Sequence, residues 1–379
     1  ALMAPTEILA FQHYNGLKPF CDAIGVKIAL LTGSSKTAAR RIIHEDLVSG
    51  ALQIIVGTHA LLEDKVQFKN LGLAIIDEQH RFGVAQRSKL WKKNVSPPHI
   101  LVMTATPIPR TLAMSVYGDL DISVIDELPA GRKTIKTVHR YDSNRLKVIG
   151  FIRDEVAKGR QIYIVYPLIN ESETLDFKDL MDGYEGIVRD FPMPNYQVSM
   201  VHGQMKPADK EFEMERFIKG KTQIMVATTV IEVGVNVPNA SVMIIESAER
   251  FGLSQLHQLR GRVGRGADQS YCVLMTSHKL SENAKTRIKT MVKTSDGFEI
   301  AEVDLKLRGP GEFFGERQSG FIKFRIADLT TDGPIIRDAR MKAFDIIHND
   351  ANLEAPINSL IKQRFDNEYL KLFLKTTVN

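Results

Sequence analysis

Two adjacent carboxylates follow a short apolar run in the first third of the sequence. Asp77 and Glu78 come directly after Leu73–Ile76, and Gln79 and His80 follow them. A buried parallel strand ends at the sheet edge where open α/β folds bind ligands. In a nucleotide hydrolase, the first carboxylate of such a pair holds Mg²⁺ through water, and the second orients or deprotonates the attacking water. The alternative is a strand end that carries two solvated acids.

Small hydroxyl residues follow the next apolar run. Thr104 and Thr106 come after Ile100–Met103, and the prolines behind them stiffen the turn. Hydroxyl groups at a strand end can hydrogen-bond a carboxylate and a phosphate-linked water. Alone, this segment could be an ordinary turn. Its position after the acid pair makes it a more specific sign of a nucleotide-hydrolase site.

Two further segments have residue types that suit phosphate. Gln258–Arg265 (Gln-Leu-Arg-Gly-Arg-Val-Gly-Arg) has three arginines and no acid. Its glycines allow close backbone approach, and planar guanidinium groups suit the spread charge of a phosphoryl transition state. Thr228 and Thr229 follow the apolar run Gln223–Ala227, so their hydroxyls and backbone N–H groups could contact a nucleic-acid phosphate. The alternative for the arginines is a basic surface loop.

The spacing of apolar runs predicts the elements that position these residues. Runs that are apolar throughout are typical of strands buried on both faces, and the amphipathic stretch Lys36–Val48 predicts a helix between two of them. Alternating strands and helices predict parallel α/β sheets. The predicted strands are Val26–Leu31, Leu52–Val56, Leu73–Ile76, Ile100–Met103, Gln161–Tyr166, Val198–Val201, Gln223–Ala227, Ser241–Ile245 and Tyr271–Met275.

The segments between and after the two strand series have their own patterns. Asp126–Gly131 contains Pro and Gly and predicts an interdomain linker. Ile169–Pro194 resembles a loose excursion with acidic and Gly/Pro content. Lys279–Lys293 predicts a basic helix, Arg308–Gly320 a Gly-rich loop, and the remainder two or three helices.

Composition excludes several classes of protein. Two distant cysteines, Cys21 and Cys272, rule out a disulfide scaffold and a four-cysteine zinc site, and no structural metal is expected. No apolar run approaches the roughly 18–20 residues of a membrane span, and no signal-peptide pattern opens the sequence. The net charge of +5 permits an anionic partner without requiring one.

The candidate segments, in this order on two α/β units, resemble the motifs of superfamily 2 helicases and translocases. That resemblance implies two RecA-like domains with ATP between them and DNA across the top. The first would be truncated at its N-terminus, and a helical region would follow the second. The expected boundaries are 1–130, 131–277 and 278–379. The matching segments are Ala4–Glu7 (motif Ia), Gly57–His59 (Ib), Asp77–His80 (II), Thr104–Thr106 (III), Thr228–Asn236 (V) and Gln258–Arg265 (VI).

Two longer stretches narrow the resemblance to the RecG family of bacterial ATP-dependent DNA helicases. The first is Thr104–Arg110 with Asp126–Arg132. The second is Leu307–Gly315, continued by Arg317–Gly320, which is similar to the translocation motif shared by RecG and the transcription-repair coupling factor Mfd. The paired phenylalanines in this stretch favour RecG. The resemblance implies a motor that remodels branched DNA, such as stalled forks and Holliday junctions.

The resemblance also implies a role for each matching residue. ATP and Mg²⁺ would be the cofactors and branched or duplex DNA the partner. The protein would be a monomer in the bacterial cytoplasm, associated with the nucleoid and not with a membrane. The implied residues are Asp77 and Glu78 (catalysis and Mg²⁺), Arg262 and Arg265 (arginine fingers), Gln79, His80, Gly234 and Gln258 (nucleotide), Thr104, Thr106, Arg308 and Gln318 (coupling), and Pro5, Thr6, Gly57, Thr58, His59, His202, Thr228 and Thr229 (DNA).

Two features depart from the family pattern. The phosphate loop G-x-x-x-x-G-K-[ST] does not occur; the nearest segment, Thr32–Thr37, has Ser35 rather than Gly before Lys36 and is interpreted as a decoy. Asn236 replaces the Asp of many relatives. We therefore expect a fragment that begins after the phosphate loop and lacks the family's wedge domain. The alternatives are a DNA-binding fragment that hydrolyses nothing and the motor of an Mfd-like protein.

Overall fold

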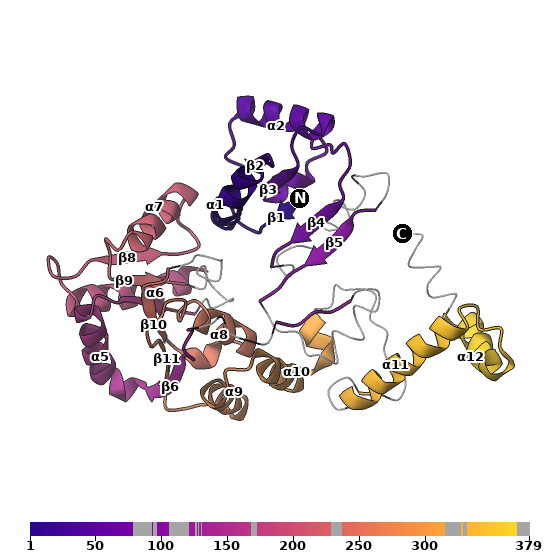
Figure 1. The fold of residues 1–379 in the computed structure, drawn as a ribbon. Helices are drawn as coiled ribbons and strands as arrows, with labels where there is room; N and C mark the ends of the chain where they lie inside the picture. Colours follow the sequence, from indigo (N-terminus) through magenta and orange to yellow (C-terminus); the bar gives the residue numbers. More distant parts are fainter. Residues whose placement is uncertain are drawn as a thin grey trace. The chain divides into compact units, whose positions relative to one another are not determined.

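The structure is a computed structural model of the 379-residue chain. It describes residues 1–78, 93, 97–105, 121–125, 127, 129, 131–167, 173–228, 237–314, 327–328 and 332–369, with the backbone alone at 173–179, 207, 309–314 and 368–369. Two sheets in which all strand pairs are parallel confirm the predicted α/β class (Figure 1).

The first sheet has the strand order β2-β3-β1-β4-β5. All four apolar runs predicted in this region form strands. The additional central strand β1 was not predicted, because two residues are too few to show a periodicity. The strands are β1 (Leu2–Met3), β2 (Ile28–Leu31), β3 (Ile54–Gly57), β4 (Leu73–Ile76) and β5 (His99–Val102).

Helices α1 (Glu7–Ala23) and α2 (Thr37–Ser49) cover opposite faces of this sheet. Leu47 of α2 packs in one buried cluster with Leu31 and Ile55, whereas Leu9 of α1 packs in another with Val56. Successive residues of a strand point to opposite faces, so Ile55 and Val56 separate the two clusters. The short 3₁₀ helix η1 (His59–Leu62) follows β3 directly.

The second sheet has the order β6-β11-β10-β7-β9-β8, and its central strands β7, β9 and β10 are buried along their whole length. Five of its six strands were predicted. The sixth, β6, is an edge strand whose polar and apolar residues are mixed, so it has no apolar run. The strands are β6 (Lys136–Tyr141), β7 (Gln161–Val165), β8 (Val198–Val201), β9 (Ile224–Ala227), β10 (Ala240–Ile245) and β11 (Tyr271–Thr276).

Helices α5 (Arg145–Ala157) and α6 (Glu173–Asp190) pack on one face of the second sheet. On the other face Tyr163 meets Phe217 of α7 (Pro207–Ile218), with ring centroids 4.8 Å apart. The helices α8 (Leu253–Arg260) and α9 (Glu282–Lys293) follow β10 and β11.

The loose excursion predicted at Ile169–Pro194 is wrong, because this segment contains α6. Leu180 and Ile187 are buried on one side of that helix, at a spacing that suits an amphipathic helix. Gly183 is a packing residue, since a Cβ atom there would lie 2.4 Å from the ring of Tyr166.

The loop predicted at Arg308–Gly320 is wrong in its first half, because α10 (Gly297–Phe314) continues through Phe314. Ile300, Ala301 and Leu305 are buried on one side of α10 and give it an amphipathic face. The chain then forms α11 (Gly333–Asn349), η6 (Pro356–Asn358), α12 (Ser359–Arg364) and a π-helical turn, η7 (Phe365–Tyr369).

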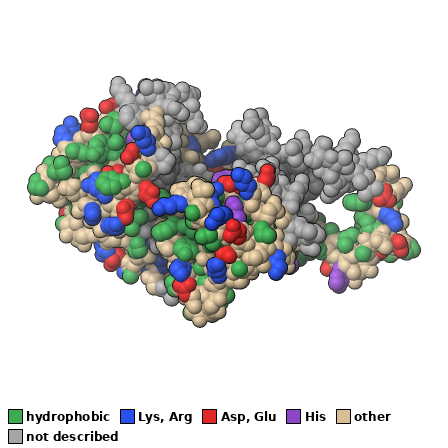
Figure 2. Space-filling model, turned by 90° about the horizontal axis from the view of Figure 1, so that it is seen from above, with side chains coloured by type: hydrophobic (Ala, Val, Ile, Leu, Met, Phe, Trp, Pro, Cys, Tyr) green, Lys and Arg blue, Asp and Glu red, His purple; other side chains and the backbone are tan. Residues whose placement is uncertain are grey.

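The chain divides into two compact units, one that holds both sheets and one that holds the helices after Ser295. None of the described helices combines the length and apolar character needed to cross a bilayer. On the face drawn in Figure 2, basic and acidic side chains are interspersed. The net charge of +5 is therefore not gathered into one patch on that face.

Candidate active site and nucleic-acid contacts

The acid pair lies at the carboxyl end of β4, as predicted. The Asp77 N–H donates to the Met3 carbonyl at 2.9 Å, which fixes the pair beside the end of β1. One Asp77 oxygen, Oδ1, accepts the Glu78 N–H at 2.9 Å, and the other, Oδ2, lies 2.8 Å from Nε2 of His13 on α1. Sequence reasoning missed His13; its only signal was a position two helical turns after Thr6.

Glu78 has a left-handed backbone, with φ of 51°. For a residue with a side chain, such a conformation costs roughly 1–3 kcal/mol and persists where the surroundings fix it. Glu78 Oε2 receives a long contact of 3.4 Å from the Ala105 N–H, and the Met103 N–H donates to the Ile76 carbonyl at 2.8 Å. The structure therefore brings the acid pair and the segment of Thr104 together at adjacent strand ends.

These residues fit part of a magnesium-nucleotide site. Carboxylate oxygens are preferred ligands of Mg²⁺, which usually retains several waters. Among the described residues, no group of three or more His, Cys, Asp and Glu side chains is placed to hold a metal. A cation at Asp77 and Glu78 would therefore complete its coordination with water and nucleotide oxygens.

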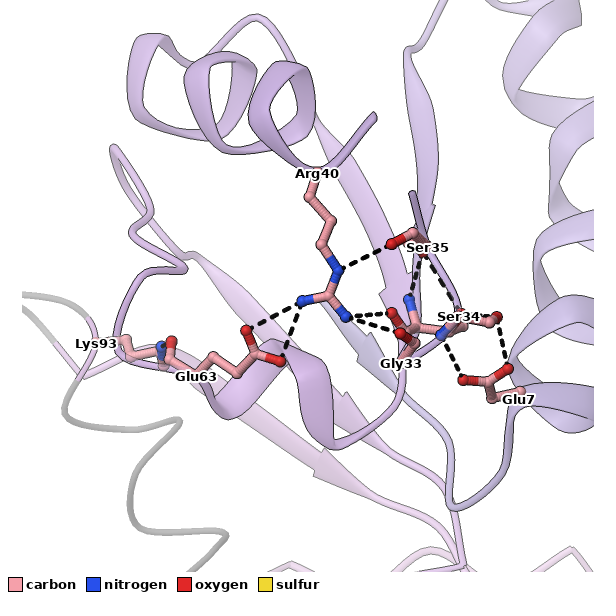
Figure 3. Close-up of polar contacts among 8 residues, drawn as sticks. Glu7, Gly33, Ser34, Ser35, Arg40, Glu63 and Lys93 are labelled. Carbon is pink, nitrogen blue, oxygen red and sulfur yellow. Dashed lines mark hydrogen bonds and ion pairs between the residues drawn. The ribbon is translucent and has the colours of Figure 1, made fainter. Parts of the chain in front are cut away.

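The turn at Thr32–Thr37, which the sequence analysis interprets as a decoy, is held by contacts with protein groups. Ser34 donates from its backbone N and its Oγ to the two carboxylate oxygens of Glu7, at 3.0 and 2.7 Å (Figure 3). The Thr32 N–H donates to Ser35 Oγ at 3.0 Å, and the Ser35 N–H donates to the Thr32 carbonyl at 3.3 Å. Three backbone N–H groups of this turn, those of Thr32, Ser34 and Ser35, therefore already donate to protein oxygens.

The arginine segment begins on α8 and continues into a tightly packed loop. Gln258 is half-buried on α8, and Arg262 is only 6% exposed. Gly264 has φ of 77°, and a Cβ atom there would lie 2.8 Å from Ile135. A Cβ atom on Gly266 would lie 2.6 Å from the Pro238 carbonyl oxygen. The glycines are thus required for the path of the loop.

Arg265 lies on the wall of a cavity of about 700 Å³ that is also lined by Arg132, Gly261 and Gly266. A volume of this size falls in the usual range for small-molecule sites. Burial lowers the pKa of Arg265, neighbouring Arg132 lowers it further, and Tyr163 and Glu78 act in the opposite direction. A guanidinium remains protonated in proteins, so Arg265 presents a partly desolvated positive charge.

The candidate DNA-contact residues of the first sheet lie together at the carboxyl ends of strands β1 and β3. The Ala4 N–H donates to the Gly57 carbonyl at 2.8 Å, so the segments after β1 and β3 are neighbours. Thr6 caps α1 by accepting the Leu9 N–H at 3.4 Å. Thr58 is buried and His59 is exposed at the start of η1. Of the two residues that precede these threonines, Gly57 is buried at the end of β3 and Pro5 is half-buried after β1.

His202 and Thr228 lie at the ends of the adjacent strands β8 and β9, where the Thr228 N–H donates to the Val201 carbonyl at 3.2 Å. Burial, followed by nearby Lys210, lowers the pKa of His202. The buried Thr228 hydroxyl has no hydrogen-bond partner among the described residues. Such a group costs roughly 1–3 kcal/mol, which a phosphate oxygen would relieve.

Arg308 lies on α10, and its Nε donates to the buried Asp304 carboxylate one helical turn earlier at 3.0 Å. This ion pair fixes the direction of the side chain within α10. Six predicted site residues lie outside the described residues: Gln79, His80, Thr106, Thr229, Gly234 and Gln318.

Arg260 is a structural residue of the arginine segment, and the sequence analysis assigned it no role. It is buried, and its Nη1 donates to the carbonyl oxygens of Met291 and Thr294 at 3.0 and 2.9 Å. Its Nη2 lies 3.0 Å from Nδ1 of His257. Arg260 thereby joins α8 to the end of α9, whereas Arg265 faces the cavity.

Family models match three parts of this chain. Residues 1–115 match the DEAD/DEAH box helicase family, and residues 144–267 match the helicase conserved C-terminal domain. Residues 294–379 match the family described as ATP-dependent DNA helicase RecG, domain 3, C-terminal.

Similar curated proteins are described as ATP-dependent DNA helicase RecG. The Synechocystis protein is 52% identical over 368 residues, covering 97% of this chain and 44% of its own length. The Bacillus subtilis protein is 49% identical over 362 residues, covering 96% of this chain and 53% of its own length. The chain therefore spans about half the length of the curated relatives it matches.

Solved structures agree with these matches. A structure of RecG bound to a three-way DNA junction is similar with a TM-score of 0.69 and 42% identity, over 88% of this chain and 43% of that chain. A structure of Dbp5 from S. cerevisiae, bound to RNA and ADP BeF3, has a TM-score of 0.53 at 13% identity over 81% of this chain and 80% of that chain; this likeness concerns the fold alone.

Proposed function

The chain belongs to the RecG family over the segment that it covers, and from that premise we propose that it is the motor portion of an ATP-dependent DNA translocase. The observation that carries the proposal is the acid pair Asp77–Glu78, seated at the carboxyl end of β4 beside the segment of Thr104. The substrate would be branched DNA, as in the structure of the relative bound to a three-way junction. The family match over residues 294–379 favours RecG over an Mfd-like protein.

The proposed chemistry divides between the two sheets. Asp77 and Glu78 would bind Mg²⁺ through water, and Glu78 would orient the attacking water. A bound Mg²⁺ supplies charge neutralisation to the nucleotide phosphates. Arg262 and Arg265 would face the negative charge of the phosphoryl group, where a partly desolvated guanidinium is effective. Gln258 would contact the nucleotide, together with Gln79, His80 and Gly234.

The remaining predicted residues would bind DNA or transmit motion. Pro5, Thr6, Gly57, Thr58 and His59 share one edge of the first sheet, and His202 and Thr228 share strand ends of the second. Their hydroxyl and backbone groups suit phosphate contacts, which position a nucleic acid without reading its sequence. We assign DNA contacts to these residues and to Thr229, and coupling to Thr104, Thr106, Arg308 and Gln318.

We also propose the predicted boundaries at 130/131 and 277/278, and a monomer that acts on DNA in the bacterial cytoplasm. The bacterial sources of the relatives support this location.

A second candidate activity concerns the 379 residues by themselves. They contain no phosphate loop, and in the segment that comes nearest to it Glu7 accepts from the Ser34 N–H and hydroxyl. Without the loop's backbone cradle and lysine, the β- and γ-phosphates lose their main contacts. We therefore propose that this segment alone binds DNA and does not hydrolyse ATP.

Phosphate release from Mg-ATP tests both proposals. It is measured for the 379-residue chain, with and without a branched DNA, and for the same chain preceded by the upstream residues of a relative such as the Bacillus subtilis protein. We expect DNA-stimulated turnover in the longer chain only. Turnover in the short chain would show that phosphate is bound through residues such as Lys36 that the proposal excludes. Inactivity of the longer chain with DNA would contradict the motor assignment.

A further inference from the structure

Three neighbouring strands of the first sheet end in segments that polar contacts tie together. Strand β1 leads into Thr6 and Glu7, strand β2 into the turn at Thr32–Lys36, and strand β3 into Thr58 and η1. The segments after β1 and β3 include the proposed DNA contacts. The turn after β2 is not part of the proposed nucleotide site. Its residues are nevertheless held by Glu7 on one side and by Arg40 on the other.

Arg40 of α2 fixes the carbonyl side of this turn (Figure 3). Its Nη2 donates to the carbonyl oxygens of Thr32 and Gly33 at 2.6 and 3.3 Å, and its Nε donates to that of Ser35 at 3.2 Å. Its Nη1 donates to both carboxylate oxygens of Glu63 at 3.2 and 3.1 Å. All three guanidinium nitrogens therefore donate to protein oxygens, so Arg40 is not oriented toward a phosphate.

The groups on either side of Arg40 and the turn, Glu7 at one end and Glu63 at the other, are also held by hydrogen bonds. Glu7, in the first turn of α1, accepts from the Ser34 N–H and hydroxyl at 3.0 and 2.7 Å. Lys93 donates to the carbonyl oxygens of Glu63 and Val66 at 2.5 and 2.8 Å, which holds the chain just after η1. A continuous set of polar contacts thus runs from the start of α1, through the turn and Arg40, to the end of η1.

We propose that Arg40 is a positioning residue that holds the turn after β2 against the end of η1, and so limits the motion of the segments of Thr6 and of Thr58 and His59, whose strands already pair. The inference rests on the proposed function, because it gives these segments a role in binding DNA. Two phosphate contacts on one strand require a fixed spacing, and a guanidinium that bridges a turn and a carboxylate limits the motion that would change it. A lysine cannot replace this geometry, because its ammonium is a point charge on a flexible stem.

The test uses charge-conserving substitutions in the 379-residue chain. Affinity for a fluorescein-labelled three-way DNA junction is measured by anisotropy for Arg40→Lys and for the matched control Arg41→Lys. Arg41 is the next residue on α2 and is 78% exposed. We expect Arg40→Lys to bind about tenfold more weakly, because a loosened network loses the equivalent of one charge-assisted contact, and Arg41→Lys to bind like the unmodified chain.

The salt dependence separates positioning from direct contact. Because Arg40 does not itself neutralise a phosphate, Arg40→Lys and Arg40→Ala should keep the slope of log affinity against log salt. A slope less steep by about 0.9 in Arg40→Ala would indicate a lost phosphate contact and overturn the positioning role. Amide exchange at residues 32–36 should accelerate in Arg40→Lys, whereas exchange in β7 and β10 should not change.

The outcomes distinguish this inference from the proposed function. If the unmodified chain shows no affinity for DNA, the assignment of DNA contacts to these strand-end segments fails. If it binds DNA and Arg40→Lys binds equally well, the inference fails and the proposed function stands. If Arg40→Lys does not fold, Glu63→Gln takes its place in the test. This substitution weakens the ion pair between Glu63 and Arg40 and leaves the bonds from Arg40 to the backbone carbonyls unchanged. A folded Glu63→Gln chain should bind about threefold more weakly, and unchanged affinity there would also overturn the inference.

Discussion

Arg265 combines partial burial with a position on the wall of a cavity, and Arg260, five residues earlier, is committed to backbone carbonyls. Arg260 and Arg265 therefore have different surroundings although they belong to one short segment. A guanidinium facing a phosphoryl group stabilises the transition state far more than the bound substrate. The contacts of each arginine thus indicate which substitution should impair turnover and which should impair folding.

Arg265→Ala should lower ATP turnover of the chain that carries the upstream phosphate loop by about 1,000-fold or more, the range known for arginine fingers. DNA affinity should stay near normal, because Arg265 is not among the proposed DNA contacts. Turnover and junction binding are measured on the same preparation, with Arg140→Ala, an exposed arginine of β6, as the control. Loss of turnover and DNA binding together would mean that Arg265 is structural.

The sequence was sufficient to predict the acid pair and the arginine segment, because consecutive residues carry their patterns. It did not predict His13, which reaches Asp77 from α1, because a contact between residues so far apart in sequence has no local pattern. The structural role of Arg260 could not be predicted for the same reason. That role depends on the end of α9, whose carbonyl oxygens accept from Arg260.

At the scale of elements, the loop after α8 has little tolerance for added volume. Gly264→Ala places a Cβ atom 2.8 Å from Ile135 and imposes φ of 77° on a residue that avoids it. Strain of this kind costs roughly 1–2 kcal/mol, and overpacking adds roughly 1–3 kcal/mol. Gly264→Ala should therefore lower the free energy of unfolding of the second-sheet body by about 2–5 kcal/mol, measured by urea denaturation.

Gly150→Ala provides a control that should raise the free energy of unfolding instead of lowering it. Gly150 lies inside α5, and a Cβ atom there would meet nothing within 4 Å. Replacing a helical glycine with alanine stabilises by roughly 0.5–1 kcal/mol. If the two substitutions changed the urea midpoint equally, the packing of the loop at Gly264 would not be the cause.

The two sheets also differ in how completely they are buried. Leu73 of β4 and Leu101 of β5 are 47% and 48% exposed, whereas β7, β9 and β10 are buried throughout. Apolar burial is the main favourable term in folding, so β4 and β5 should open more easily. Amide exchange should be faster in β4 and β5 than in β7 and β10. Equal protection would contradict this ranking.

Most strands could be predicted because their sequences are apolar throughout, although β4 and β5 prove to be only partly buried. The exceptions have physical reasons. The edge strand β6 has a mixed sequence, and β1 contains two residues. Helix α6 was mistaken for a loop because Gly183 and its acidic residues suggested turns, although the glycine is required by the ring of Tyr166.

At the scale of the whole molecule, net charge and nucleic-acid binding are linked. The chain has a net charge of +5, and basic and acidic side chains are interspersed on the face in Figure 2. Because that face has no broad basic patch, we expect affinity for DNA to come from a few lysine and arginine contacts with phosphate. About four such contacts would lower the affinity for duplex DNA about 100-fold between 50 and 200 mM salt.

This salt dependence is measured by anisotropy titration of the 379-residue chain with a duplex and with a three-way junction. The slope gives the number of phosphates neutralised, and circular dichroism at each salt concentration checks that the fold is unchanged. A junction that contacts both sheets should give a steeper slope than a duplex that contacts one, because more counterions are released. An affinity independent of salt would mean that no lysine or arginine of the chain neutralises a DNA phosphate.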